Sequence, residues 1–326
     1  MNKNTYRLTL LSLLLILVLP VLTMLMCYQS EPLTLKDSHP KNEVEQVNDN
    51  IETEIKSPLY VAIGNEVKIK NYFDFIDSIV IKYDSLVPYT LSEHLLVHAN
   101  PWIIDHLVDT DYYTLIEKGE FLFDQKEKVI LFSHDALIIP DTNWVKKYQY
   151  KQSQTYLDIN VPQYRLSIIE GNKTLHSFPV RVGRNKERYL ETAGRVEDLR
   201  TRTGKGTIDK ITRNPIYINP VDGHHYESTL RDDGRRTKLP QIPFLHPKIN
   251  GHRWGQLIHP TTNIETLEKA YSNGCIGTGE GAAWLIYYYA PIGTPITIRY
   301  DLNVLNESGD SIQLKDIYRT KSKPAS

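Results

Sequence analysis

A histidine and a cysteine stand close together in the last third of the chain. His259 lies in the stretch 256–263, and Cys275, the only cysteine after position 27, lies in the stretch 270–277. A thiolate is a strong nucleophile, and an imidazole in contact with a thiol can take its proton and later return it to a leaving amine. The two residues therefore predict a cysteine nucleophile with a histidine base. The alternative is a buried cysteine that packs as a small apolar residue.

The residues around Cys275 suit this chemistry. Gly274 allows backbone conformations that are closed to other residues. The N–H groups of Gly274 and Cys275, which face the start of a predicted helix, would hold the oxyanion of a tetrahedral intermediate. A strand that ends at His259 and a loop that delivers Cys275 would bring the pair together.

Residues 151–302 predict a mainly β domain around this pair. Apolar and polar residues alternate in its first segments, and Gly171-Asn172 predicts a hairpin turn. A long stretch at 183–255, rich in Arg, Gly, Pro and Asp, shows few periodic segments. We expect strands at 156–161, 165–170, 174–182, 255–259 and 295–300, short helices at 264–270 and 278–290, and a polar tail at 303–326.

Residues 58–150 predict a separate small α+β domain of unknown role. Apolar residues recur at helical spacing in three segments, with Ser92 and either Asp109 or Thr110 as N-caps, whereas 74–81 fits a helix or a strand. A Tyr-Thr start, an Asn-Pro in the middle and an Ile-Pro end resemble a LysM peptidoglycan-binding repeat. The central glycines of that repeat are missing, so a packing domain is the favoured interpretation.

Residues 1–27 predict a targeting segment. Lys3 and Arg7 precede an uncharged apolar run at 8–26, which reaches the roughly 18 residues that span a bilayer. The charges ahead of the run would keep the N-terminus in the cytoplasm and send the rest outward. An uncleaved anchor, a lipoprotein modified at Cys27 and a cleaved signal peptide all remain open. Each of them places the bulk of the chain in the cell envelope, outside the cytoplasm.

The remaining composition limits the possible partners. Residues 28–57 are acidic and polar with few aromatics, so we expect a disordered linker. A net charge of −1 gives no reason to expect a nucleic-acid partner. We expect no metal or other cofactor, because the spacing of four histidines fits no compact ligand pattern: His224, His225, His246 and His252. Trp254 and Trp284 are expected in the core.

Three motifs resemble the L,D-transpeptidases that carry a YkuD-type catalytic domain. The histidine followed by Ser272-Asn-Gly-Cys275-Ile resembles the signature of that family, which has a histidine at a strand end and then Ser/Thr-His-Gly-Cys. Phe178-Pro-Val-Arg-Val-Gly183 resembles the end of its opening hairpin, and Arg202-Thr-Gly-Lys-Gly206 resembles its Thr-Pro-x-Gly stretch. The resemblance covers about residues 155–300. It implies a YkuD-like β-sandwich with a short helix after the nucleophile.

The resemblance also implies an activity and site residues. Cys275 would attack a carbonyl of a peptidoglycan stem peptide, with His259 as base, and an amine of a neighbouring stem would resolve the acyl-enzyme into a cross-link. Ser272 and Asn273 would orient the site, and the carbonyl of Pro260 would orient the imidazole, since proline keeps its C=O.

Two positions depart from the family pattern. Asn273 stands where the motif usually has a second histidine, so an orienting role survives there but a proton role does not. Gly277 stands where many members carry arginine or asparagine, so a charge that could bind a substrate carboxylate is missing. Arginines on the long loops could replace it, and we take Arg202, Arg235 and Arg236 as candidates, besides Arg195, Arg200 and Arg231. Solvated loop arginines are the alternative for all six.

Two further functions stay open. Water in place of the acceptor amine would make the protein an L,D-carboxypeptidase. Asn273 and Gly277 also leave room for a non-catalytic cell-wall-binding protein that retains the fold.

Overall fold

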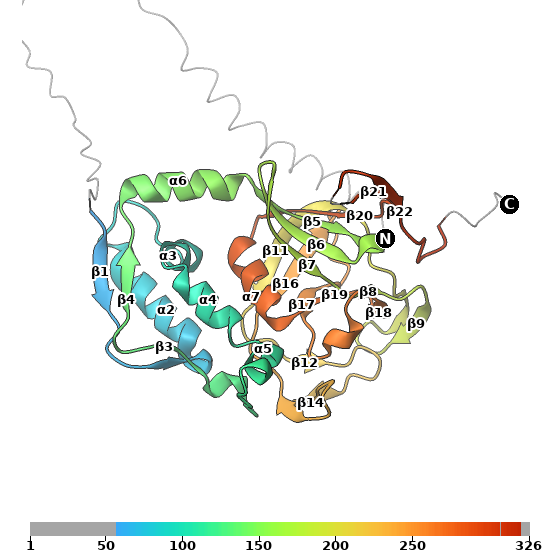
Figure 1. Cartoon of the computed structure of the whole chain (residues 1–326), viewed down its shortest axis with the longest axis horizontal. Coiled ribbons are helices and arrows are strands. Elements are labelled where there is room, and N and C mark those ends of the chain that lie inside the picture. Colours follow the sequence, from blue (N-terminus) through green and yellow to red (C-terminus); the bar gives the residue numbers. More distant parts are fainter. Residues whose placement is uncertain (1–56, 307, 321–326) are drawn as a thin grey trace, which may run out of the picture. The chain divides into compact units, whose positions relative to one another are not determined.

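The computed structural model describes residues 57–306 and 308–320 of the chain (Figure 1). The targeting segment predicted at 1–27 and all but the last residue of the linker predicted at 28–57 lie outside the described residues and stay predictions. Within the described part of the chain, no helix is long and apolar enough to cross a membrane.

Residues 58–153 form helices and short strands. Strand β1 pairs with β4 and strand β2 with β3, both antiparallel. The elements in chain order are β1 (Leu59–Ala62), β2 (Val67–Lys68), α2 (Ile69–Asp84), α3 (Glu93–Ala99), α4 (Trp102–Val108), α5 (Tyr112–Glu117), a 3-10 turn (Gln125–Glu127), β3 (Val129–Leu131), β4 (Ala136–Ile139) and α6 (Thr142–Ser153). A separate domain at 58–150 stays a prediction.

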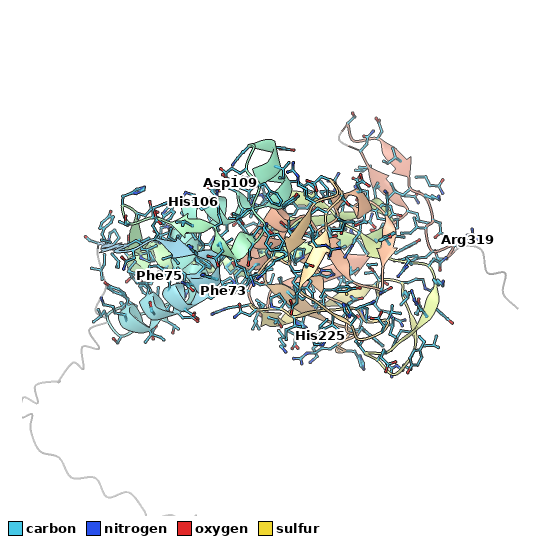
Figure 2. The ribbon with its side chains drawn as sticks, turned by 90° about the horizontal axis from the view of Figure 1, so that it is seen from below. Phe73, Phe75, His106, Asp109, His225 and Arg319 are labelled. Carbon is cyan, nitrogen blue, oxygen red and sulfur yellow. The ribbon has the colours of Figure 1, made fainter. Side chains whose placement is uncertain are left out.

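The segment 74–81, which fits a helix or a strand by sequence, is part of helix α2. Ile69, Tyr72, Phe73 and Ile76 are buried at the spacing of one helical face. The side chains of this helix, including Phe73, are drawn in Figure 2. A strand would place alternate residues on opposite faces, so this apolar set can be buried together only as a helix.

One of the two predicted helix caps is present. Ser92 Oγ accepts a hydrogen bond from the N–H of Leu95 at 3.2 Å, which caps α3 as predicted. Helix α5 is capped by Asp111, whose carboxylate accepts two N–H groups of the first turn, and not by Asp109 or Thr110. Asp109 is the C-terminal flanking residue of α4, and the Thr110 side chain donates back to that helix, so neither is free to cap the next one.

An eight-stranded sheet forms the centre of the later part of the chain. Its order is β19-β17-β16-β11-β20-β5-β6-β7, and only the pairs β17–β19 and β20–β5 are parallel. The strands are β5 (Thr155–Asn160), β6 (Arg165–Glu170), β7 (Lys173–Pro179), β11 (Gly204–Thr212), β16 (Phe244–Ile249), β17 (Ile258–Pro260), β19 (Ile276–Thr278) and β20 (Pro295–Arg299). The predicted mainly β class is confirmed.

Two inner strands of this sheet, β11 and β16, fall in the stretch 183–255, which showed little periodicity by sequence. Gly206 lies inside β11, and a Cβ there would lie 1.8 Å from the carbonyl oxygen of Lys248 in β16. Pro247 occupies the middle of β16, opposite Ile208. Glycine and proline are disfavoured inside strands, so local propensity hides both strands and the close packing of their backbones explains the glycine.

The rest of the chain adds short strand pairs around the sheet. These are β8 (Val182–Gly183) with β18 (Ala270–Ser272), β9 (Glu187–Leu190) with β10 (Arg195–Asp198), β12 (Tyr217–Ile218) with β13 (His225–Tyr226), β14 (Ser228–Leu230) with β15 (Arg236–Lys238), and β21 (Asn303–Leu305) with β22 (Ser311–Gln313). The helix expected at 264–270 is only a 3-10 turn at Ile264–Thr266.

In the polar tail expected at 303–326, the structure describes residues 303–306 and 308–320. Besides the β21–β22 hairpin, this tail carries Tyr318, which is buried and donates a hydrogen bond to the Gly183 carbonyl at 2.8 Å. A single aromatic residue in a polar segment gives no periodic signal, so the sequence pattern missed this contact. Residues 321–326 lie outside the described part.

Helix α7 (Glu280–Tyr289) joins the sheet to the helices of residues 58–153. Tyr287 and Tyr288 donate hydrogen bonds to Glu93 of α3 at 2.8 and 3.0 Å, and Phe73 lies 6.1 Å from the ring of Trp284. Trp284 is fully buried, as expected. Trp254 was expected in the core but is 50% exposed, because it lies in the exposed loop between β16 and β17.

Candidate active site

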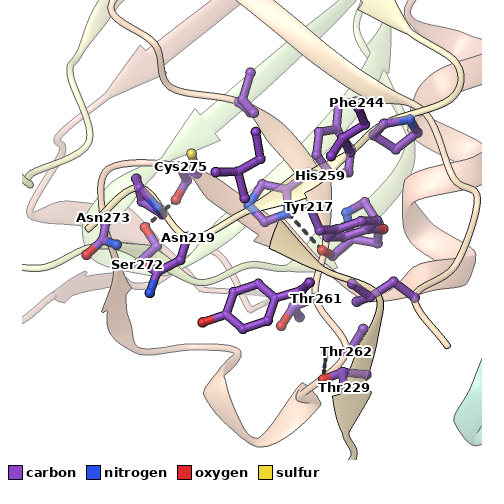
Figure 3. A pocket seen from close by; sticks show the side chains of 18 of the residues that line it. Tyr217, Asn219, Thr229, Phe244, His259, Thr261, Thr262, Ser272, Asn273 and Cys275 are labelled. Atoms are coloured by element: carbon purple, nitrogen blue, oxygen red, sulfur yellow. Dashed lines mark hydrogen bonds between the residues drawn. The ribbon is translucent and has the colours of Figure 1, made fainter. Parts of the chain in front are cut away.

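Strand pairing brings His259 and Cys275 to one face of the sheet. In the parallel pair β17–β19, His259 lies opposite Gly277. Residues opposite each other share a face, and so do residues two apart along a strand. Cys275 precedes Gly277 by two positions, so its thiol belongs to the same face as the imidazole. Both side chains line one cavity of about 1160 Å³ (Figure 3).

The imidazole of His259 is held in one tautomer. Its Nδ1 lies 2.8 Å from the carbonyl oxygen of Pro260, the acceptor expected from the sequence. A carbonyl can only accept, so Nδ1 carries the proton and Nε2 keeps a free lone pair. Burial, with the nearby charge of Arg181, lowers the pKa of His259 to about 4 against the opposing effect of the Pro260 carbonyl. The imidazole is therefore neutral at pH 7 and able to accept a proton.

The thiol of Cys275 is protonated at rest. Burial raises its pKa, while a backbone hydrogen bond from Leu257 and the charge of Arg181 act in the opposite direction. With a neutral imidazole beside it, the resting pair at neutral pH is thiol and imidazole. The nucleophile forms when the proton moves from Sγ to the histidine.

The turn before Cys275 is fixed by hydrogen bonds. Ser272 Oγ donates to the carbonyl of Cys275 at 2.5 Å and accepts from the N–H of Gly274 at 3.2 Å. Gly274 has a φ of +110°, which side chains with a Cβ rarely adopt. Thr201 Oγ1 donates to the Gly274 carbonyl at 3.0 Å. Ser272 and Gly274 thus set the direction in which the thiol points.

The predicted oxyanion site differs in two details. The N–H of Gly274 donates to Ser272, so the N–H of Cys275 is the better candidate donor. Helix α7 begins only at Glu280, after the strand β19, so Cys275 does not stand at its N-terminus as expected. The residues between Cys275 and the helix form strand β19, which pairs with β17.

Asn273 is positioned by an arginine. Its Oδ1 accepts a hydrogen bond from Nη2 of Arg184, and the Arg184 guanidinium lies 6.0 Å from the centre of the Tyr271 ring. All three residues line the cavity. The asparagine therefore keeps a fixed orientation without a titrating group.

The predicted loop arginines are not gathered at this site. Arg236 lines the cavity, whereas Arg202 and Arg235 do not. Arg202 lies over the ring of Trp254 at 5.2 Å, and Arg235 lies over Phe121 at 5.4 Å. The other three are in ion pairs elsewhere: Arg195 with Glu197, Arg200 with Asp198 and Arg231 with Glu280.

Sequence analysis did not single out Arg181, which lies beside the candidate pair. Arg181 follows β7, lines the same cavity, and exchanges two backbone hydrogen bonds with Gly277, at 2.9 and 3.0 Å. The one signal in the sequence is an arginine inside the otherwise apolar stretch 178–183. An arginine flanked by two valines suggests the end of a buried strand. The sequence alone does not show that this strand end lies next to Cys275.

The wider cavity has aromatic and apolar walls. Phe244 packs against His259, with ring centres 5.2 Å apart, and Tyr217 packs against Phe244 at 5.1 Å. Exposed apolar side chains line it further out: Ile216, Ile218, Tyr226 and Leu230. His225, labelled in Figure 2, is exposed on β13. Among the residues that the structure describes, no group of three or more His, Cys, Asp or Glu could hold a metal ion.

A family model decides the relationship of this part of the chain. Residues 154–298 match the model of YkuD, the L,D-transpeptidase catalytic domain. The predicted resemblance to this family is confirmed. The match includes His259, Cys275 and Arg181, and we call residues 154–298 the YkuD domain. A search of curated protein sequences found no match.

Solved L,D-transpeptidases are similar to the chain at low identity. The enzyme from Mycobacterium smegmatis has 15% identity and a TM-score of 0.31, over 45% of this chain and 58% of the other. The structure from Xylanimonas cellulosilytica has 14% identity and a TM-score of 0.33, over 74% of this chain and 98% of the other. The alignment thus spans less than two thirds of the M. smegmatis protein.

Proposed function

We propose that the protein is a peptidoglycan L,D-transpeptidase that forms cross-links between stem peptides through a cysteine acyl-enzyme. The YkuD domain supports a transpeptidase-type reaction. The observation that carries the proposal is the parallel pair β17–β19, which puts Cys275 and His259 on one face inside one cavity. The wide cavity with its apolar and aromatic walls suits a peptide.

In the first half-reaction the Sγ proton of Cys275 passes to Nε2 of His259, and the sulfur attacks the carbonyl carbon that follows the diamino acid of a tetrapeptide stem. The N–H of Cys275 stabilises the oxyanion of the tetrahedral intermediate. The bond to the nitrogen of D-alanine then breaks, and His259 gives that nitrogen its proton. A thioester to Cys275 remains.

In the second half-reaction an amine of a neighbouring stem attacks the thioester carbon. His259 takes a proton from the amine, the C–S bond breaks, and the proton returns to the sulfur. The products are an amide cross-link and the free thiol. Water in place of the amine would give a tripeptide, which is the L,D-carboxypeptidase alternative.

Two measurements on the purified protein test the proposal. Incubation with tetrapeptide muropeptides should give cross-linked dimers, and intact-mass spectrometry after exposure to a carbapenem should show one covalent adduct. Cys275→Ser should give neither. Tripeptide without dimers would support the carboxypeptidase, and a wild type that forms no adduct but binds sacculi would support a non-catalytic wall-binding protein.

We also propose a location in the cell envelope, which the match to the YkuD domain supports. The apolar run at 8–26 would anchor the chain, with lipid modification of Cys27 as the less favoured alternative. Fractionation of cells that express the full chain tests this. Both forms stay in the membrane fraction, so incorporation of labelled palmitate separates them: a lipoprotein takes up the label and loses it in Cys27→Ser, whereas an anchored protein is not labelled.

A further inference from the structure

The face that carries Cys275 and His259 holds a third side chain, although Gly277 contributes none. A Cβ on Gly277 would lie 2.5 Å from Nε of Arg181, 2.8 Å from its Cγ and 3.0 Å from its Cδ. Gly277 is not among the glycines with a positive φ, so its backbone conformation suits any residue. The glycine is explained by space alone: the arginine occupies the volume that a side chain at position 277 would take.

The backbone holds Arg181 in this place. Its N–H donates to the Gly277 carbonyl at 2.9 Å, and its carbonyl accepts from the Gly277 N–H at 3.0 Å. Because the arginine side chain lies over Gly277, with His259 opposite that glycine and Cys275 two residues before it, the side chain lies next to both candidate catalytic residues.

The guanidinium of Arg181 lacks an anionic partner. Its Nη1 donates to Thr266 Oγ1 at 3.3 Å, and its Nε is buried with no hydrogen-bond partner in the described part of the chain. No carboxylate of residues 57–306 or 308–320 forms an ion pair with it. A buried cation without a counter-charge is costly. The groups nearby that can become negative are the thiol of Cys275 and the phenol of Tyr271.

We propose that Arg181 is the cation that stabilises the thiolate of Cys275, from the space that a side chain at position 277 would otherwise fill. This rests on the proposed function only in taking Cys275 as the nucleophile. The other charged or titratable groups near the thiol are His259 on β17, Tyr271 on β18, and Arg184, which is held by Asn273. Of these, only Arg184 carries a permanent positive charge, and that charge is engaged with Asn273.

In this proposal Arg181 and His259 have different roles in activating the thiol. The guanidinium favours the thiolate and disfavours a second positive charge on the imidazole, and the pKa of both Cys275 and His259 is lowered by it. His259 then acts as a carrier of the proton, and Arg181 as the permanent counter-charge of the sulfur. The arginine is a positioning and electrostatic residue in this scheme and has no proton role.

Charge-selective alkylation of Cys275 tests the proposal without any peptide. The rates with neutral iodoacetamide and with anionic iodoacetate are measured by intact mass from pH 5 to pH 10. An adjacent cation stabilises the thiolate and attracts the anionic reagent. For Arg181→Gln we expect a midpoint of the pH–rate profile about one unit higher, and an iodoacetamide rate at pH 7 about tenfold lower. The ratio of the iodoacetate rate to the iodoacetamide rate should also fall.

Matched variants make the result specific. Arg181→Lys should keep much of the rate ratio, because the charge remains. Arg188→Gln removes the same charge from an exposed residue of the same cavity and should leave both profiles unchanged. Arg181→Ser combined with Gly277→Arg should restore the rate ratio, since the new side chain enters the space that the old one left.

The proposal is overturned if Arg181→Gln, folded by circular dichroism, has the wild-type profile and rate ratio, or if Arg188→Gln changes them equally. If Arg181→Gln does not fold, a double variant that folds but does not regain the rate ratio overturns it as well. The alkylation result is independent of muropeptide turnover, so failure of the transpeptidase proposal and failure of this one are told apart.

Discussion

Arg231 and Glu280 form a fully buried ion pair, with Nη1 and Oε1 2.5 Å apart. Arg231 follows strand β14, which lines the cavity, and Glu280 is the first residue of α7. Glu280 Oε2 also accepts the N–H of Tyr112 at 3.0 Å and Nε2 of Gln125 at 2.7 Å. The cavity wall, the helix after the nucleophile and the segment 58–153 therefore meet at one carboxylate.

Removal of this carboxylate should destabilise the protein strongly. Glu280→Ala leaves the guanidinium of Arg231 buried without a counter-charge, so we expect a loss of about 3–5 kcal/mol in the free energy of unfolding. Urea unfolding followed by circular dichroism measures it. The control is Asp109→Ala, which breaks an exposed pair with Lys118 and should cost about 1 kcal/mol or less. Equal losses in both variants would contradict the buried network.

Tyr113 of α5 should support substrate binding from outside the YkuD domain. Its hydroxyl lies 3.0 Å from the carbonyl of Thr262, a residue of the cavity wall, and accepts the N–H of Asp232 at 3.1 Å. Tyr113→Phe removes about 1 kcal/mol of hydrogen bonding, so we expect KM for a stem peptide to rise about fivefold with little change in kcat. Tyr150→Phe, at a 70% exposed position, should leave both constants unchanged. An unchanged KM in Tyr113→Phe would show that α5 does not hold the wall.

Loss of the thiol should separate chemistry from stability. Cys275→Ala is expected to abolish acylation by a carbapenem while the free energy of unfolding stays within about 1 kcal/mol of wild type. Activity assays and urea unfolding of the same preparation check both parts. A loss of several kcal/mol would instead identify Cys275 as a packing residue.

Removal of the His259 imidazole should lower the alkylation rate of the Cys275 thiol while the thiol itself remains. His259→Ala deprives Sγ of its base, so the iodoacetamide rate of Cys275 at neutral pH should fall severalfold. His176→Ala, on β7 and outside the cavity, serves as the control. A rate in His259→Ala equal to that of wild type would argue against the assigned base.

The acylation rate should decline on the acid side only at an unusually low pH. His259 has a pKa of about 4, well below the ordinary value near 6.5. A base is active while unprotonated, so the acylation rate should hold as the pH falls through 6.5 and decline only toward pH 4. Carbapenem acylation between pH 4 and pH 8, with circular dichroism to verify folding, measures this. A decline centred near pH 6.5 would mean that the imidazole is solvated in solution.

The fold was predictable where local patterns are strong. Strands β5, β6 and β20 follow from alternation, and helix α7 from an apolar run that ends before Pro291. Strands β11 and β16 could not be predicted from the sequence, because they contain Gly206 and Pro247, which are poor strand formers. Their conformation is fixed by the neighbouring strands. The buried Tyr318 was missed for a related reason, since its partner Gly183 is far away in the chain.

The sequence by itself determined the candidate nucleophile, its base and the family, because Cys275, His259 and the glycine before the cysteine stand within one short stretch whose residue types imply the chemistry. Only the tertiary structure decided the electrostatics of the pair. Arg181 reaches Gly277 through strand pairing between distant segments, and the protonation states of Cys275 and His259 follow from burial. Neither strand partners nor burial is encoded in local spacing, since both arise when the whole chain packs.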